Sequence, residues 1–169
     1  MTLKEFNELP ARDAIEELLR CCGSKRWAED MTTRRPFRGF GDLHLAAEEV
    51  WINLTPTDWK EAFAHHPKIG DIKSLRKKFG STAQWASGEQ AGITSTTERV
   101  LKALADGNKL YEAKFGYIFI VCATGRSAEE MLIMLNARLD NYPADELKIA
   151  AREQGKITRL RLEKLLTTT

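Results

Sequence analysis

Apolar residues recur at intervals of three and four along most of this chain, which is the spacing of one face of an α-helix. The clearest run begins after Leu9 and ends at Cys22, where Gly23 supplies a stop signal. Further helices are expected around Trp27 and Met31 and over 43–54, 55–66, 72–79, 95–115, 127–139 and 143–166. Helical periodicity on this scale predicts an all-α fold.

Helix-start signals support these assignments. Capping boxes, which pair a Ser or Thr with an acidic residue three positions later, are expected at Thr55, Ser95 and Ser127. Pro143 stands at a first-turn position, where proline is favoured. At roughly 100–200 residues per domain, the 169 residues predict a single domain over 1–169. We expect a bundle of about seven to nine helices.

Two segments depart from the helical pattern. The run 117–123 is β-branched and aromatic, as strands are, but a lone strand has no partner to pair with. We therefore expect one short, buried, extended segment there. Residues 80–94 are rich in Gly, Ser and Thr and predict a loop. Loops of this length often carry function.

Composition excludes several classes of protein. The net charge is only +2 and no long block of like charge occurs, so capture of nucleic acid or of an anionic membrane is not expected. No apolar run is long enough to span a bilayer. The three cysteines are sparse and lack metal-site spacing, which favours reduced thiols in the cytoplasm.

The pair His65 and His66, followed by Pro67, is the first candidate for chemistry. A histidine at a helix C-terminus faces the negative end of the helix dipole, which favours its protonated form. Its ordinary pKa near 6.5 suits a proton donor or acceptor. On spacing alone, a pair that merely ends the helix, with one ring packed and one solvated, is the commoner case.

A second candidate is Glu89 beside Gln90, in the predicted loop. A carboxylate and an amide among small residues suit a general acid or base, or a substrate anchor. A solvated loop glutamate is the alternative. Adjacent histidines usually diverge in direction and no second ligand set occurs nearby, so no metal site is expected.

A third candidate, Arg161, interrupts the apolar stripe of the last predicted helix. A cation on a buried face needs a partner, because an unpaired buried charge is strongly unfavourable. The partner could be a structural carboxylate, or a ligand with carbonyl or carboxylate oxygens that a guanidinium can grip. The segment from Phe119 to Ala123 raises a related question, because its extended backbone groups also need partners.

Five motifs occur together in a recognisable order. They are Arg35-Pro-Phe37, His66-Pro67, Glu89-Gln-Ala-Gly92, Phe115-Gly-Tyr-Ile-Phe-Ile-Val-Cys-Ala123 and Lys156-Ile-Thr-Arg-Leu-Arg-Leu162. In this respect the sequence resembles the 2-oxo-4-hydroxy-4-carboxy-5-ureidoimidazoline (OHCU) decarboxylase family over nearly its whole length. The resemblance implies an all-helical fold, a homodimer and the last step from urate to (S)-allantoin.

The resemblance also implies roles for particular residues. His66 matches the catalytic histidine, Glu89 a catalytic and substrate-contacting carboxylate, and Arg161 the arginine that grips the substrate. The other implied substrate-binding residues are Pro67, Ala86, Ser87, Gly88, Gln90, Phe119, Ile120, Val121, Cys122 and Ala123. The family often has serine three residues before the glutamate, where this chain has Ala86 followed by Ser87.

The implied reaction would need no cofactor or metal, because the substrate carries a ring imine that accepts the electron pair released with CO2. The protein would orient the ring and control protonation, with His66 managing the hydroxyl proton. Two other functions are also compatible with these residues. One is a helical binding module without enzymatic activity, and the other is a ureide hydrolase in which His66 and Glu89 activate water.

Overall fold

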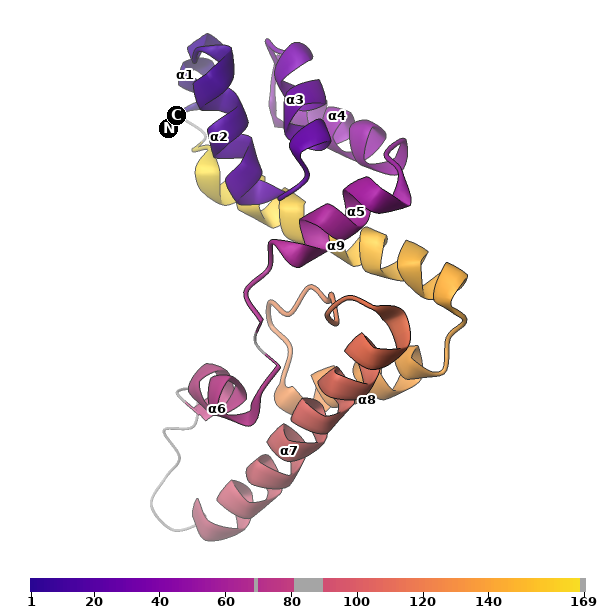
Figure 1. The fold of residues 1–169 in the computed structure, drawn as a ribbon. Coiled ribbons are helices and arrows are strands. Elements are labelled where there is room, and N and C mark those ends of the chain that lie inside the picture. The colour runs from indigo at the N-terminus through magenta and orange to yellow at the C-terminus, as the bar shows by residue number, and fades with distance from the viewer. Residues whose placement is uncertain (69, 81–89, 168–169) are drawn as a thin grey trace. The chain divides into compact units, whose positions relative to one another are not determined.

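The computed structural model describes residues 1–68, 70–80 and 90–167. Within those ranges it contains nine α-helices and no β-sheet (Figure 1). They are α1 (Leu3–Glu8), α2 (Ala11–Cys21), α3 (Lys25–Thr33), α4 (Phe40–Ile52), α5 (Pro56–Ala64), α6 (Ile72–Gly80), α7 (Gln90–Phe115), α8 (Ala128–Leu139) and α9 (Pro143–Leu165). The predicted all-α fold is confirmed.

Three of the four predicted helix starts are found, and one of these is the start of α9 at Pro143. The Thr55 hydroxyl accepts a hydrogen bond from the Asp58 N–H, and the Asp58 carboxylate accepts one from the Thr55 N–H. The Ser127 hydroxyl accepts the Glu130 N–H at the start of α8. The start predicted at Ser95 is wrong, because α7 begins at Gln90. Helix propagation adds one hydrogen bond per residue, so a nucleated helix extends over weak helix formers. The predicted loop over 80–94 is therefore wrong at Gly80 and at 90–94.

The strand-like run lies in the connection between α7 and α8 and is neither helix nor sheet. Its expected burial is found only in part. Tyr117 and Ile120 are buried, whereas the side chains of Phe119 and 121–123 are half-buried. An irregular segment alternates in side-chain direction without a sheet to cover both faces, which leaves part of it exposed.

Contacts divide the described residues into two compact units. The first unit comprises 1–66, 120–122 and the residues from 147 onward, and the second comprises 67–119 and 123–146. Compact units defined by contacts need not fold separately, so a single domain over 1–169 stays a prediction.

Tryptophan side chains tie the helices of the first unit together. The Trp27 indole N–H donates to the Ala47 carbonyl oxygen at 3.2 Å, and that of Trp51 donates to the Ala151 carbonyl oxygen at 2.7 Å. The two ends of the described chain meet in the same unit, where the N–H of Thr167 donates to the carbonyl oxygen of Met1 (Figure 1). Fully buried side chains of this core are Phe6, Leu18, Trp27, Met31, Leu43, Phe63 and Leu162. Helix α9 is thereby fixed against α4.

The second unit is organised around a buried polar cluster. Helices α7 and α8 pack against each other, with α6 beside α7. Glu146, at the start of α9, is completely buried and accepts hydrogen bonds from Tyr111, Arg138 and Asn141. The Arg138 guanidinium lies 4.6 Å from the centre of the Phe119 ring. Three helices and the segment after α7 therefore share one network.

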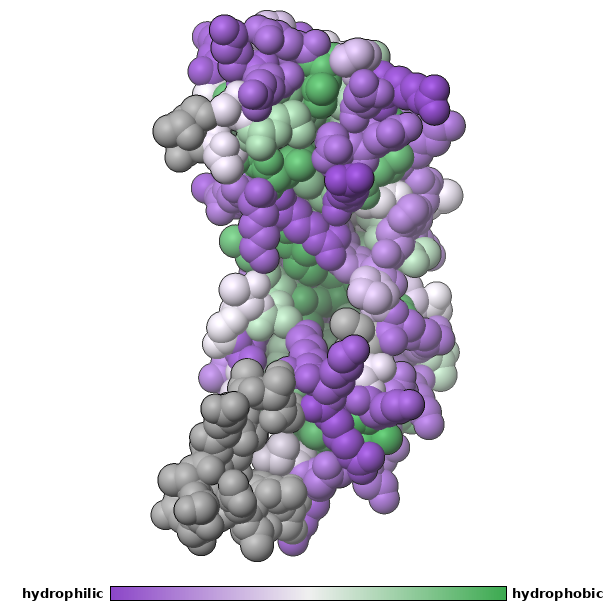
Figure 2. Space-filling model, turned by 90° about the vertical axis from the view of Figure 1, so that its left-hand side faces the viewer, coloured by the Kyte–Doolittle hydropathy of each residue, from purple (hydrophilic) through white to green (hydrophobic). Residues whose placement is uncertain are grey.

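Hydrophilic residues cover much of the face shown in Figure 2, with apolar residues exposed between them. In the described part of the chain, no helix combines the length and the apolar character that a membrane span requires.

Candidate active site

His66 follows the C-terminus of α5 and is half-buried, whereas His65 before it is exposed. The capping box at Thr55 fixes where α5 begins, and the helix ends at Ala64. Close approach of the chain at Gly23 leaves room for the His65 ring. A Cβ atom on Gly23 would lie 2.3 Å from both Cβ and Cγ of His65. The local backbone therefore places the two rings in different environments, as one of the sequence interpretations expects.

Both ring nitrogens of His66 have partners on α9. Nε2 is hydrogen-bonded to the Gln154 side-chain oxygen, and Nδ1 lies 3.5 Å from Nη2 of Arg161. Burial lowers the pKa of His66; the positive charges of Arg161 and His65 lower it further, and the bond to Gln154 raises it. The imidazole is therefore neutral at pH 7. The sequence left the charge of this ring open, with the helix dipole favouring the protonated form; burial favours the neutral one.

Arg161 is half-buried and contacts no carboxylate among the described residues. Its other contact is the carbonyl oxygen of Cys21, 3.5 Å from Nη1. A carbonyl oxygen and a neutral imidazole leave a full positive charge uncompensated in a partly desolvated place. The sequence allows two kinds of partner for Arg161, a structural carboxylate or a ligand. No carboxylate in the described part of the chain contacts Arg161. The geometry favours a ligand that carries oxygens.

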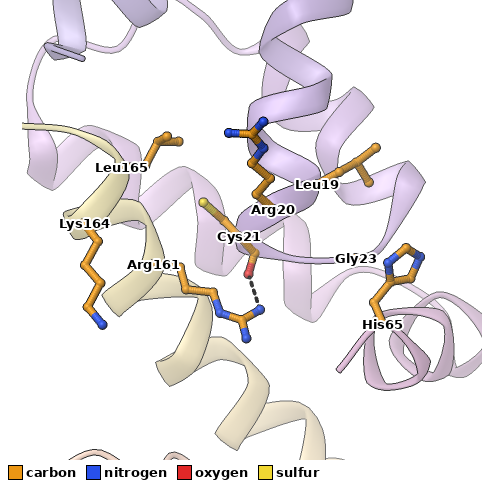
Figure 3. Close-up of a pocket in the computed structure, with 8 residues that line it drawn as sticks. All are labelled: Leu19, Arg20, Cys21, Gly23, His65, Arg161, Lys164 and Leu165. Atoms are coloured by element: carbon orange, nitrogen blue, oxygen red, sulfur yellow. Dashed lines mark hydrogen bonds between the residues drawn. The ribbon is translucent and has the colours of Figure 1, made fainter. Parts of the chain in front are cut away.

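Arg161 borders a pocket of about 610 Å³ in the first unit (Figure 3). Its described lining consists of Leu19, Arg20, Cys21, Gly23, His65, Arg161, Lys164 and Leu165. This lining holds three permanent cations and no acidic side chain, although Arg20 also pairs with Glu17 at 3.4 Å. Positive charge on the walls of a pocket raises the local concentration of small anions. The pocket therefore suits an anionic ligand.

The cysteines beside Arg161 are thiols at neutral pH. Burial raises the pKa of Cys21 to about 12 and that of Cys22 to about 11. A thiolate is the reactive form of cysteine. Burial therefore disfavours the nucleophilic form of both side chains, and the Cys21 backbone is what contacts Arg161.

Helix α9 also anchors the segment that follows α7. The N–H of Cys122 donates to the Glu153 carboxylate at 3.4 Å, and Lys156 pairs with the same side chain at 2.6 Å. Glu153 is buried and directly precedes Gln154. One turn of α9 thus contacts both His66 and the backbone of 120–122, which belong to the same compact unit.

A sequence profile of the OHCU decarboxylase family matches residues 7–163. The chain belongs to this family. It is 41% identical over 148 residues to the uric acid degradation bifunctional protein TTL of Arabidopsis thaliana. That match covers 87% of this chain but only 45% of the plant protein.

Two further relatives belong to the same family. The OHCU decarboxylase of Amia calva is 33% identical over 135 residues, covering 78% of this chain and 75% of the relative. A crystal structure of OHCU decarboxylase in the presence of (S)-allantoin has a TM-score of 0.71 and 40% identity. The match covers 89% of this chain and 96% of the chain in that crystal structure.

Several residues that the family resemblance implicates lie outside the first unit or outside the described ranges. Ala86, Ser87, Gly88 and Glu89 are not among the described residues. Gln90 is the first residue of α7, and Pro67 is exposed in the second unit. Phe119 and Ala123 also belong to the second unit. His66, Arg161 and residues 120–122 therefore belong to the same compact unit.

The sequence analysis missed two polar residues that contact this site. Gln154 and Thr158 are buried on α9, and the Gln154 amide nitrogen donates to the Thr158 hydroxyl at 3.1 Å. A signal was present, because both residues precede Arg161 at helical spacing along the same apolar stripe. No group of His, Cys, Asp or Glu in the described ranges could hold a metal ion.

Proposed function

We propose that this chain decarboxylates OHCU to (S)-allantoin and CO2, as the last step in urate degradation. The observation that carries the proposal is the neutral His66 beside Arg161, a cation without a carboxylate partner in the described part of the chain. Family membership supplies the substrate class. The chain spans 45% of its Arabidopsis relative, so the activity is assigned here to this segment alone.

The arrangement suits a decarboxylation in which the substrate accepts its own electrons. When the bond to the carboxylate breaks, its electron pair moves toward the ring imine and CO2 departs. The hydroxyl proton is then lost as the ring carbonyl forms, and a proton adds to the carbon that bears the ureido group. The side on which that proton adds decides whether the product is (S)-allantoin.

Arg161 and His66 would divide this work between them. As the carboxylate leaves, negative charge moves onto the ring, where a fixed guanidinium stabilises it in a partly desolvated site. Neutral His66 can accept the hydroxyl proton, because burial keeps its pKa low. Substrate oxygens would replace the contact of 3.5 Å between Arg161 and Nδ1 of His66. Glu89, Gln90 and the backbone of 119–123 are proposed to complete the substrate contacts.

Circular dichroism tests the proposal. OHCU is generated in place by urate oxidase and hydroxyisourate hydrolase, with and without this protein. We expect rapid optical activity of (S)-allantoin, against slow decay to a racemate without the protein. His66→Ala should lower the enzymatic rate about 10²-fold or more, as the loss of a general base does. A ring-opened product without CO2 release would instead identify a hydrolase.

Substitution of one arginine tests the role of Arg161 against a matched control. Arg159 lies on the same helix, two residues away, and is exposed in an ion pair with Glu163. Arg161→Gln should abolish most activity, whereas Arg159→Gln should leave it near the wild-type value. Equal losses in the two variants would contradict a specific role for Arg161.

We also propose that the protein is a cytoplasmic homodimer. Leu45 and Ile52 are exposed large apolar side chains, seven residues apart on α4, and a second copy would cover them. The three cysteines form no disulfide bond among the described residues, as is typical of a reducing compartment. Light scattering after size exclusion would give the mass of one chain if the protein is not a homodimer. Cell fractionation tests the cytoplasmic location.

A further inference from the structure

The two ends of the Gln154 side chain have different partners. Its oxygen faces Nε2 of His66, and its nitrogen donates to the Thr158 hydroxyl at 3.1 Å. The Gln154 side chain is completely buried and Thr158 is 5% exposed, so water cannot replace either contact freely. A side chain held at both ends in this way fixes the orientation of its amide.

This orientation decides which nitrogen of His66 carries hydrogen. A neutral imidazole has one N–H group and one lone pair, and an amide oxygen can only accept. Nε2 must therefore carry the hydrogen that Gln154 receives. Arg161, which can only donate, lies on the side of Nδ1 at 3.5 Å. Gln154 fixes this tautomer through its close contact, and the longer contact with Arg161 favours the same one.

The contacts with Thr158 and Arg161 together oppose a turned amide. The Thr158 hydroxyl is also hydrogen-bonded to the Cys22 side chain, whose pKa burial raises to about 11, so that group is a thiol. A turned amide would present its NH₂ group to Nε2 and its oxygen to the hydroxyl. The first of these contacts would move the hydrogen of His66 to Nδ1, directly opposite the guanidinium of Arg161. That arrangement sets donors against each other in a buried place.

We propose that Gln154 and Thr158 are positioning residues that hold His66 as the Nε2–H tautomer, with the Nδ1 lone pair presented to the substrate beside Arg161. The catalytic consequence rests on the proposed function, but the tautomer itself does not. General bases act through a lone pair in hydrogen-bond reach of the proton they accept. Thr158 and Gln154 thus present that lone pair before substrate arrives.

Nitrogen NMR of the ¹⁵N-histidine-labelled protein tests the tautomer without any activity measurement. In the wild type at neutral pH, we expect hydrogen on Nε2 of His66 and none on Nδ1. Gln154→Leu and Thr158→Val should each give a mixture of tautomers. Thr32→Val is the matched control, because Thr32 is a buried threonine in another helix, bonded to the Ala28 carbonyl oxygen. It should leave the His66 signals unchanged.

A conservative variant separates positioning from packing. In Gln154→Glu the carboxylate still accepts from Nε2, so the tautomer should be kept. The added negative charge should raise the pKa of His66, although the positive charges of Arg161 and His65 oppose this change. The pH profile of kcat should therefore shift to higher pH. Gln154→Leu should lower kcat at least about tenfold with little change in KM, because general-base catalysis contributes about 10²–10⁴.

The outcomes distinguish the two proposals. A wild-type His66 with hydrogen on Nδ1, or a Gln154→Leu variant that keeps both tautomer and kcat, overturns the positioning proposal. If the protein fails to produce (S)-allantoin but the tautomer responds to these variants as expected, the proposed function alone is wrong. Urea denaturation checks that each variant is folded before its spectrum is compared.

Discussion

At the scale of single residues, the site depends on close packing as much as on charge. Gly23 lets the backbone after α2 approach His65 so closely that a Cβ atom would overlap the imidazole. His66 in turn owes its neutral state to burial and to Arg161. Neither effect can be read from residue type, because each depends on a neighbour distant in the chain.

Replacement of Gly23 by alanine should disturb the site. The new methyl group would lie 2.3 Å from two atoms of His65, so that ring must move. Overpacking of this kind costs about 1–3 kcal/mol. We expect a lower free energy of unfolding in urea and a lower rate of (S)-allantoin formation. Gly41→Ala is the control, because nothing lies within 4 Å of its added Cβ. Equal stability of the two variants would contradict the prediction.

At the scale of elements, local signals fix helix positions well, but the joints between helices depend on buried polar contacts. Thr55 and Ser127 cap their helices as their sequences predict, whereas α7 begins before its predicted capping residue. The Glu146 cluster joins α7, α8 and the start of α9. Its members are far apart in sequence, and no periodic pattern identifies them as partners.

The buried pair of Arg138 and Glu146 should contribute more to stability than an exposed pair. Arg138→Met would leave the Glu146 charge buried without its main partner, at a cost of about 3–5 kcal/mol. The control, Arg76→Met, removes an exposed ion pair with Glu98 and should cost about 0–1 kcal/mol. Urea denaturation of both variants measures the difference. Similar losses in the free energy of unfolding would show that the buried pair contributes no more to stability than the exposed pair.

At the scale of the whole molecule, buried histidines couple folding to pH. Burial lowers the pKa of both His44 and His66 from the ordinary value of 6.5. Below that value the unfolded chain takes up protons that the folded chain does not. The stabilising contribution is therefore present above pH 6.5 and is lost as pH falls toward the folded-state pKa values.

We therefore expect the melting temperature to fall between pH 7.5 and 5.5. Carboxylates with lowered pKa values, such as Glu5 and Glu98, take up protons only at still lower pH. They therefore do not change the melting temperature in this range. Scanning calorimetry of the wild type and of His44→Gln measures the effect. The variant should show a shallower dependence on pH. A wild-type melting temperature that does not change over this range would contradict the assignment of neutral histidines.

The candidate site was only partly predictable. His66 and Arg161 stand out because one follows a helix and the other interrupts an apolar stripe. Gln154 and Thr158 interrupt the same stripe but carry no charge, so the sequence does not single them out as partners of His66. Glu89 and the segment 86–88 lie outside the described residues, and their proposed roles stay predictions.

Periodicity, capping and ordered motifs are local properties of the chain, so they suffice to predict the helical class, most helix positions and the family. Which residues those helices bring into contact depends on the folded chain. The tertiary structure placed Gln154 and Arg161 on opposite sides of the His66 ring, and so set its charge and tautomer. The reason is physical: the pKa of a group and its hydrogen-bond geometry depend on neighbours in space, and these come from residues 88 and 95 positions away in the chain.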